Sequence, residues 1–179
     1  AHQICGRYYA DHLFDHRGMD GCFPGCNLQC TKGGWTTLVS GGHAGRKVWV
    51  DGHQYETAAG FGANPGIFSA TFIMEANWHC DNYGIDTITA AGGMAFLMEC
   101  FQRGYLTAED GEGLVLSWGD EASSLEFIHR LARGMTDMAR AAGKGIITLT
   151  GWVCGRHTGR TGADIRPELA KFAMQAKGL

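Results

Sequence analysis

Three cysteines lie close together near the start of the chain, in the run Gly21-Cys22-Phe23-Pro24-Gly25-Cys26-Asn27-Leu28-Gln29-Cys30. Pro24 has no backbone N–H donor, and the glycines favour irregular dihedral angles, so this run cannot be a regular helix or strand. Three thiolates on one loop can converge on a soft metal centre, and an iron–sulfur cluster is the usual occupant when thiolates are this dense. We therefore expect Cys22, Cys26 and Cys30 to be metal ligands, with a fourth ligand from elsewhere.

Zinc binding and disulfide formation are alternative roles for these cysteines. A structural zinc site usually shows two Cys or His pairs with a longer spacer between them, and the second pair is missing here. Disulfides stabilise small secreted domains, whereas this chain has seven cysteines, an odd number, and 45% hydrophobic residues. The loop of radical S-adenosylmethionine enzymes has the pattern Cys-x3-Cys-x2-Cys, whose second gap is one residue shorter than in this chain.

Two carboxylates form a second candidate site, in the run Asp81-Asn82-Tyr83-Gly84-Ile85-Asp86. A carboxylate can accept two neighbouring N–H donors of a ligand bidentately, with assistance from its charge. Gly84 between the two lets the backbone turn and approach a flat ring closely. The structural alternative is that Asp86 only caps a helix and that Asp81 is a solvated residue at a helix end.

The elements that must position these residues are predicted to be mainly helical, with a small β ribbon near the N-terminus. Residues 35–39 and 47–50 are β-branched and aromatic runs, and the Gly-rich segment between them indicates a hairpin. Helical periodicity follows at 69–80 with a Ser69 cap, ended by Gly84, and at 87–103 with an Asp86 cap, ended by Gly104. Cys80 and Cys100 fall in the apolar phase of these two helices and are expected to be core residues.

The rest of the chain gives a weaker pattern. Residues 114–119 read as short and extended, and helices are predicted at about 121–133, near 135–143 and from Pro167 to Ala176. The segment 143–162 is rich in glycine and β-branched residues, and we interpret it as a strand plus a mobile loop. His12 and His16 are one helical turn apart, and we interpret them as a solvated helix face rather than a metal-binding pair.

Length and charge limit the classes of function. The 179 residues have the size of one domain, and a net charge of −3 gives no electrostatic footprint for nucleic acid or an anionic membrane surface. We see no apolar stretch long enough to span a membrane and no signal peptide, and reduced cysteines suit the cytoplasm. The chain begins with Ala1 rather than Met, so we expect it to be part of a longer polypeptide.

Several motifs together resemble one enzyme family. They are Gly52-His53-Gln54-Tyr55-Glu56-Thr57, Asn77 through Ile88, Met94-Ala95-Phe96-Leu97-Met98-Glu99-Cys100, Leu116-Ser117-Trp118-Gly119 and the closing segment Phe172 through Leu179. In this order they are similar to the middle of the tungsten-dependent aldehyde:ferredoxin oxidoreductases, from about Cys22 to the end of the chain. Within that family, the chain looks nearest to uncharacterised bacterial oxidoreductases.

The resemblance implies a fold, two cofactors and site residues. Members of the family are much longer and bind tungsten, sometimes molybdenum, through two pyranopterins beside one [4Fe–4S] cluster; this chain resembles their first helical domain. It implies that Cys22, Cys26 and Cys30 are cluster ligands, although the first gap is one residue longer than the family's usual Cys-x2-Cys-x3-Cys. It also implies that Asp81, Gly84, Ile85 and Asp86 bind pterin. The family's second cysteine motif is absent here, and Cys154 does not match it.

The same resemblance assigns the chemistry. Glu56 matches the glutamate of the family's Tyr-Glu-Thr motif, where a carboxylate can take a proton from a hydrated aldehyde. The implied enzyme oxidises an aldehyde or reduces an acid, and its electrons leave through the cluster to a ferredoxin-like carrier, with the remaining domains or subunits completing the site. The alternative is a non-catalytic electron-transfer module whose cysteines bind an iron–sulfur cluster or zinc. On either account residues 1–179 form one helical segment, with the cysteine loop and ribbon at 1–66 and the helices at 67–179.

Overall fold

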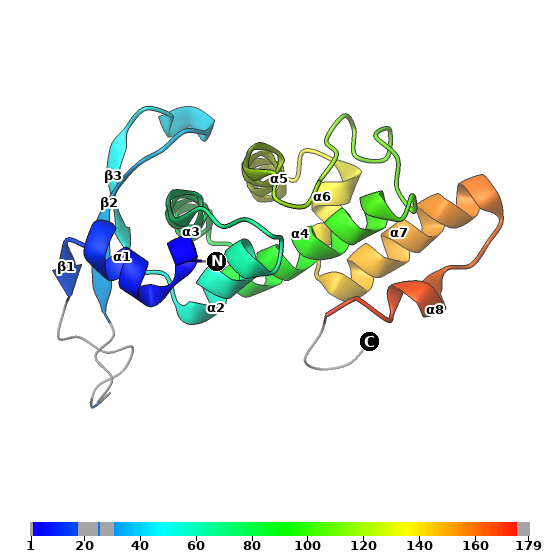
Figure 1. Cartoon of the computed structure of the whole chain (residues 1–179). Helices are drawn as coiled ribbons and strands as arrows, with labels where there is room; N and C mark the ends of the chain where they lie inside the picture. Colours follow the sequence, from blue (N-terminus) through cyan, green and yellow to red (C-terminus); the bar gives the residue numbers. More distant parts are fainter. Residues whose placement is uncertain (1, 18–24, 26–30, 175–179) are drawn as a thin grey trace.

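A computed structural model describes residues 2–17, 25 and 31–174. It confirms the predicted class, because eight α-helices and a small antiparallel sheet make up the regular structure of these residues. Figure 1 shows the sheet at one end of an elongated molecule and the longest helices side by side toward the other end.

The sheet lies near the N-terminus, as predicted. Its strands β1 (His16–Arg17), β2 (Lys32–Thr37) and β3 (Lys47–Asp51) follow the order β1-β2-β3, and both pairings are antiparallel. Trp35 pairs with Trp49 in the β2–β3 register, and the one-turn helix η2 (Gly41–His43) lies in the connection. The predicted hairpin is confirmed, and β1 adds a third, two-residue strand.

Two long helices carry the segment with the paired aspartates. Helix α3 (Ala70–Tyr83) begins at the predicted cap, where the Ser69 hydroxyl accepts the Phe72 amide at 3.3 Å. It ends at Gly84, whose φ of 67° lies in the left-handed region that glycine adopts without strain. Helix α4 (Thr87–Gln102) follows with Asp86 as its N-cap, and Gly104 after it also has a positive φ.

One of the remaining α-helices is as long as α4, and the others are shorter than α3. These remaining helices are α1 (Gly6–His12), α2 (Tyr55–Ala58), α5 (Glu121–Arg133), α6 (Asp137–Ala142), α7 (Ile146–Thr161) and α8 (Arg166–Leu169), with the one-turn helix η1 (His2–Ile4) and the π-helical turn η3 (Ala59–Ala63). The bounds of α5 and α6 confirm two predictions. The predicted last helix is shorter than expected, and residues 114–119 contain no strand.

The prediction for 143–162 was wrong, because this segment contains α7. Leu149, Thr150, Val153 and Cys154 are buried, a spacing of four residues along one helical face. Packing of that face against α4 and α6 outweighs the weak helix propensity of its glycines and β-branched residues. His12 and His16 also do not share a helix, since α1 ends at His12 and His16 lies in β1.

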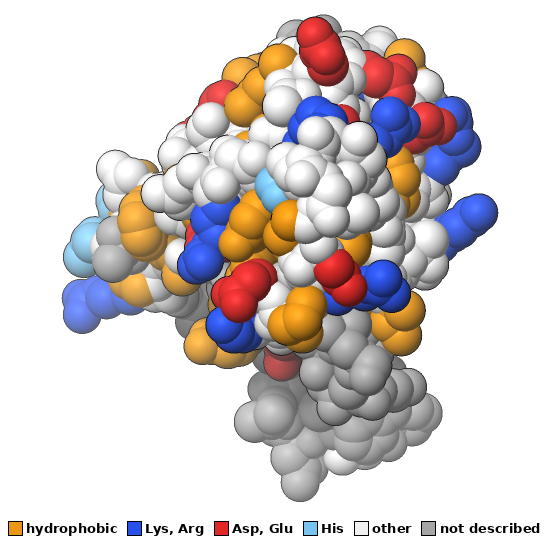
Figure 2. All heavy atoms as spheres, turned by 90° about the vertical axis from the view of Figure 1, so that its right-hand side faces the viewer, with side chains coloured by type: hydrophobic (Ala, Val, Ile, Leu, Met, Phe, Trp, Pro, Cys, Tyr) orange, Lys and Arg blue, Asp and Glu red, His pale blue; other side chains and the backbone are white. Residues whose placement is uncertain are grey.

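The core has two parts. The larger cluster, which includes Phe61, Met94 and Ile128, joins α3, α4, α5 and the C-terminal helices, and both Cys80 and Cys100 are buried in it as predicted. A smaller cluster contains Tyr9, Val50 and Met74 and fixes the sheet and α1 against α3. None of the helices in the described ranges is long and apolar enough to cross a membrane. Figure 2 shows acidic, basic and apolar side chains intermixed on one face.

Candidate functional site

The turn between α3 and α4 carries both predicted carboxylates. The Gly84 amide donates to the Asp81 carbonyl at 3.3 Å, and the Ile85 amide donates to the Cys80 carbonyl at 2.9 Å. These bonds close the end of α3 and let the chain reverse at Gly84. Asp81 therefore lies in the last turn of α3 and Asp86 at the start of α4, both exposed.

Asp86 caps α4, as the structural alternative expected. Its Oδ2 accepts the Thr89 amide at 2.7 Å. Hydrogen bonds from the Thr89 side chain and amide lower the pKa of the Asp86 carboxyl, which therefore stays charged. A carboxylate has about four lone-pair sites, so capping leaves acceptor capacity for a ligand.

Asp81 has different surroundings. Its Oδ2 accepts the Asn77 side-chain amide at 2.9 Å, and that amide also reaches the Asp51 carbonyl at 3.4 Å. Partial desolvation of the Asp81 carboxyl raises its pKa above the ordinary value, and the negative charge of Asp51 adds a smaller contribution. A ligand that offers N–H donors or positive charge would relieve this repulsion.

A pocket of about 310 Å³ opens beside the same turn. Its lining comes from the α3–α4 turn, from α4 and from the α5–α6 region: Tyr83, Gly84, Ile85, Asp86, Thr89, Ala90, Gly93, Phe127, Leu131, Ala132, Ala142 and Gly143. Three of the four predicted cofactor-binding residues, Gly84, Ile85 and Asp86, thus border one concave surface.

Glu56, the predicted catalytic residue, lies in α2 and is exposed. The next residue, Thr57, is buried, and its hydroxyl is 2.8 Å from that of Thr87, the first residue of α4. Thr87 directly follows Asp86. The Tyr-Glu-Thr segment and the aspartate turn, 30 residues apart in sequence, are therefore joined by a side-chain hydrogen bond.

The three predicted cluster ligands, Cys22, Cys26 and Cys30, lie outside the described residues. Among the described residues no group of three or more His, Cys, Asp or Glu side chains could hold a metal ion. Burial raises the pKa of Cys80 to about 12, with smaller contributions from Asp81 and Asp86, so this thiol stays protonated. The Cys154 thiol donates to Asp164 Oδ1 at 3.2 Å, consistent with a packing role.

A polar network next to the turn was not predicted. Glu75, only 2% exposed, accepts the Ser40 amide at 2.8 Å, the Ser40 hydroxyl at 2.7 Å and the Val39 amide at 2.9 Å. His79 Nε2 lies 3.3 Å from the same carboxylate. The sequence does contain a signal for this network. Glu75 lies between Met74 and Ala76 in an apolar helix, and a histidine follows four residues later.

The network continues to the aspartate turn through His129 of α5. Its Nε2 lies 2.9 Å from the Ser40 hydroxyl, and its Nδ1 lies 2.9 Å from the Tyr83 hydroxyl. Burial, and to a smaller extent the nearby His79, lowers the pKa of His129. The ring is therefore neutral and carries one proton. Because Ser40 donates to Glu75, the consistent assignment is that His129 donates from Nε2 to Ser40 and accepts from Tyr83 at Nδ1.

Comparison with known proteins identifies relatives of the chain. Residues 1–179 match the family described as aldehyde ferredoxin oxidoreductase, domains 2 and 3. The chain is 37% identical over 84 residues to a tungsten-containing aldehyde ferredoxin oxidoreductase of Thermococcus kodakarensis, covering 46% of this chain and 14% of that protein. It is 34% identical over 85 residues to the enzyme of the same name in Pyrococcus furiosus, covering 47% of this chain and 14% of that protein.

A third relative has a different name. The chain is 35% identical over 105 residues to the WOR-like subunit of an aliphatic sulfonate oxidoreductase of Pyrococcus furiosus, covering 59% of this chain and 16% of that subunit. In all three comparisons the matched region spans well under a fifth of the relative's length.

Proposed function

We propose, because this chain belongs to the aldehyde ferredoxin oxidoreductase family, that it forms part of the binding site for a tungsten or molybdenum bis-pyranopterin. The complete enzyme would oxidise an aldehyde or reduce an acid. Electrons would pass through a [4Fe–4S] cluster to a ferredoxin-like carrier. Residues 1–179 would be one cluster- and pterin-binding segment, with the cysteine loop and ribbon at 1–66 and the helices at 67–179.

The hydrogen bond between Thr57 and Thr87 is the observation that carries this proposal. It joins the segment with the candidate base, Glu56, to the first turn of α4, which begins after Asp86. A metal-pterin enzyme needs its proton acceptor and its cofactor-binding groups at one place. The shared bond between two buried or half-buried threonines supports such an arrangement.

The residues of the turn fit a pterin in chemical type. Asp81 and Asp86 are exposed acceptors, although neighbouring atoms partly desolvate the Asp81 carboxyl. This desolvation and the charge of Asp51 raise the pKa of Asp81, so a partner with N–H donors would stabilise its charged form. Gly84 has a left-handed φ, and no atom of the described residues lies within 4 Å of its would-be Cβ, which leaves the backbone open to a ligand. Gly84 and Ile85 would contribute backbone groups beside the two carboxylates.

The roles of the remaining residues follow from their chemistry. When bound, the metal centre supplies two-electron redox chemistry and the cluster supplies one-electron transfer. Glu56 would accept the proton of a hydrated aldehyde at its carboxylate. Cys22, Cys26 and Cys30 would hold the cluster through their thiolates, with the fourth ligand from another part of the enzyme.

The test separates pterin binding from helix capping, and it uses the full-length protein. Asn is as good an N-cap as Asp but has no charge, so Asp86→Asn should leave the stability nearly unchanged. Asp81→Asn and Asp86→Asn should each weaken cofactor retention by about 1.5–3 kcal/mol, the contribution of a charged hydrogen bond. Metal and pterin content of the purified protein gives the readout.

Two further variants serve as controls. Asp86→Ala should lose the cofactor and also about 0.5–2 kcal/mol of stability, because it removes the cap. Asp120→Asn changes the equivalent cap of α5, where Oδ1 accepts the Ala122 amide at 3.0 Å, and should keep wild-type metal and pterin. If the Asp81→Asn, Asp86→Asn double variant still holds stoichiometric pterin, the two carboxylates are only structural. Iron or zinc without pterin in the wild-type protein would favour the non-catalytic module.

A further inference from the structure

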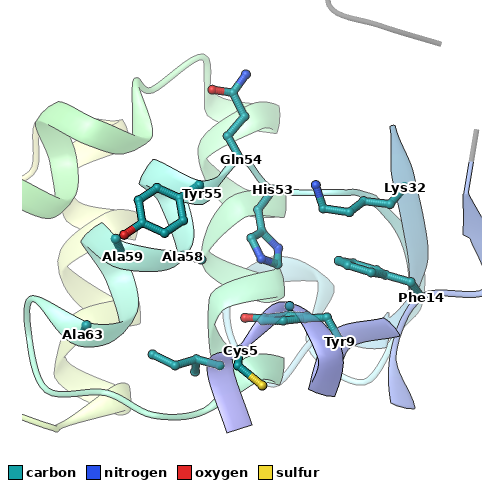
Figure 3. Close-up of a pocket in the computed structure, with 12 residues that line it drawn as sticks. Cys5, Tyr9, Phe14, Lys32, His53, Gln54, Tyr55, Ala58, Ala59 and Ala63 are labelled. Carbon is teal, nitrogen blue, oxygen red and sulfur yellow. The ribbon is translucent and has the colours of Figure 1, made fainter. Parts of the chain in front are cut away.

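Two pockets adjoin the residues of the proposed site. One borders the aspartate turn, and the other lies beside Tyr9 and His53 and reaches α2, which carries Glu56 (Figure 3). A further groove, of about 590 Å³, lies between α6 and α7 and shares no lining residue with these two pockets. It is therefore a separate surface of the molecule.

One helical face on each side forms this α6–α7 groove. Its polar and aromatic lining residues recur every three or four positions along α6 and the turn after it, and every four positions along α7: Asp137, Arg140, Lys144, Thr148, Trp152 and Arg156. The eight residues from Thr148 to Arg156 rise about 12 Å along the helix. The groove is therefore long enough for a short segment of polypeptide.

Positive charge is concentrated around the groove. Residues 133–160 contain five lysines or arginines and one acidic residue, Asp137, although the whole chain has a net charge of −3. Three of the five basic residues, Arg140, Lys144 and Arg156, line the groove together with Asp137. The sign of this surface thus differs from that of the chain as a whole.

Asp137 is shared by two arginines. Its Oδ1 accepts a hydrogen bond from Arg140, and its Oδ2 accepts one from Arg156 at 2.8 Å. These arginines lower the pKa of Asp137, chiefly through the hydrogen bond from Arg140, so the carboxylate is ionised at neutral pH. Glu112 accepts the Asp137 amide at 3.0 Å, at the opposite end of α6 from Lys144. The excess of positive charge therefore lies toward Lys144 and Arg156.

Trp152 gives the groove an apolar floor. The indole is half-buried against the main core, and the Arg156 guanidinium lies 5.4 Å from its ring centroid, within the range of a cation–π contact. Arg156 is thus held by the indole and by Asp137, and it loses little side-chain freedom when it binds a further carboxylate. Gly155 also lines the groove, and no described atom lies within 4 Å of a methyl group placed there. A partner can approach the backbone at this point.

The exposure of the charges favours a protein segment over a small anion. The side chains of Arg140 and Arg156 are 55% and 43% exposed, and an exposed ion pair changes affinity by at most about fivefold. A free phosphate would gain only such contacts. An acidic segment gains several of them together and also removes apolar surface of Trp152 from water.

We propose that the α6–α7 groove docks an acidic segment of a partner protein, whose carboxylates pair with Lys144 and Arg156 and whose apolar side chains cover Trp152. The partner is not the electron carrier. The cysteine run proposed to hold the cluster lies between β1 and β2 in sequence, and Figure 1 shows these strands at the opposite end of the molecule from α7. No groove residue takes part in the pterin binding or catalysis proposed above, so the inference does not depend on that function.

The probe is a helical peptide of about 15 residues, near the shortest stable length, with glutamates on both sides of a row of leucines. The same peptide with glutamine at every glutamate position is its uncharged counterpart. Fluorescence anisotropy with the full-length protein should show saturable binding of the acidic peptide and weaker binding of the glutamine peptide. Raising the salt from about 50 to about 500 mM should reduce this preference, because salt screens exposed charges.

Two substitutions should act in opposite directions. Lys144→Glu should weaken binding of the acidic peptide about 5- to 30-fold, because it replaces an exposed attraction with a repulsion of similar size. Asp137→Asn should strengthen binding about 2- to 10-fold, because it removes the carboxylate that competes for Arg140 and Arg156. A variant that only damaged the fold would bind more weakly, so the gain separates docking from a structural effect.

Arg7→Glu is the matched control, since it makes the same change of charge at a side chain of α1 that is 89% exposed and lies outside the groove. It should bind the acidic peptide like the wild type, and circular dichroism checks that all variants keep their helices. Absence of saturable binding up to about 1 mM peptide would mean that the rest of the polypeptide covers the groove, and it would overturn the proposal. Equal affinity for the two peptides, or equal effects of Lys144→Glu and Arg7→Glu, would also overturn it.

Discussion

Glu75 is a carboxylate inside an apolar helix, and its surroundings keep it charged. Burial alone would raise its pKa, but hydrogen bonds from His79, Ser40 and the Val39 amide lower the pKa below the ordinary value. The folded protein therefore gains more from the ionised form than the unfolded chain does. The carboxylate is the group through which the β2–β3 connection is attached to α3.

Glu75→Gln should destabilise the protein by about 1–3 kcal/mol at neutral pH, because the charge is lost and an NH2 group faces backbone donors. Denaturant unfolding measures this change. The lowered pKa also fixes the pH dependence: the stabilisation is present above the ordinary value of 4.5 and is lost as pH falls through the folded-state pKa. Below pH 4.5 the wild type should lose stability more steeply than the variant.

Glu126→Gln is the control for this experiment. Glu126 lies on α5, its side chain is 47% exposed, and it pairs with Arg130 at 2.8 Å. Removing such an exposed pair should change stability by at most about 1 kcal/mol. If Glu75→Gln were as mild as Glu126→Gln, the network would contribute little to the attachment of the hairpin.

At the scale of elements, the sequence predicted helices wherever apolar spacing and a cap agreed. Ser69, Asp86 and Gly84 marked the ends of α3 and α4 almost to the residue. The prediction for segment 143–162 was wrong because its local sequence pattern and its tertiary environment favour different structures. Gly151, Gly155 and Gly159 weaken the helical pattern, yet they face outward on α7 while the opposite face packs into the core.

Gly155→Ala should stabilise the protein by about 0.5–1 kcal/mol, since glycine in a helix interior loses more backbone entropy than alanine. No atom of the described residues lies within 4 Å of a methyl group placed there. Gly162→Ala should instead destabilise the protein, because Gly162 ends α7 with a left-handed φ of 75°. Midpoints of denaturant unfolding measure both. A destabilising Gly155→Ala would mean that something packs on this face of α7.

The candidate site was less predictable than the helices. Its residue types could be chosen from sequence, because paired carboxylates around a glycine and a Tyr-Glu-Thr segment match a known family. The sequence could not predict which of these residues contact one another. The hydrogen bond between Thr57 and Thr87 and the contact between Tyr83 and His129 depend on how distant helices pack. The pairing of Ser40 with His129 spans 89 residues and left no local signal.

At the scale of the whole molecule, the chain holds only part of the proposed site. It matches domains 2 and 3 of the family but well under a fifth of each curated relative's length. Residues 1–179 alone should therefore show no aldehyde oxidation with a viologen dye, because a bispterin centre needs binding groups from more than one domain. Turnover by the isolated 179 residues would contradict this.

In the full-length protein the same assay tests Glu56. Glu56→Gln should lower the rate about 10²- to 10⁴-fold, as the loss of a general base does, while metal and pterin content stay at the wild-type level. Glu99→Gln, a glutamate of α4 that pairs with Arg103, is a control expected to keep full activity.

The network around Glu75 also has a consequence for the order of folding. Its partners come from the β2–β3 connection, from α3 and from α5, and they lie 35 to 89 residues apart in sequence. Helices form from local contacts, whereas a junction of three distant segments must wait until long loops have closed. We therefore expect the junction to form after the main folding barrier. It would then act mainly by slowing the unfolding of the hairpin rather than by speeding the folding of the helices.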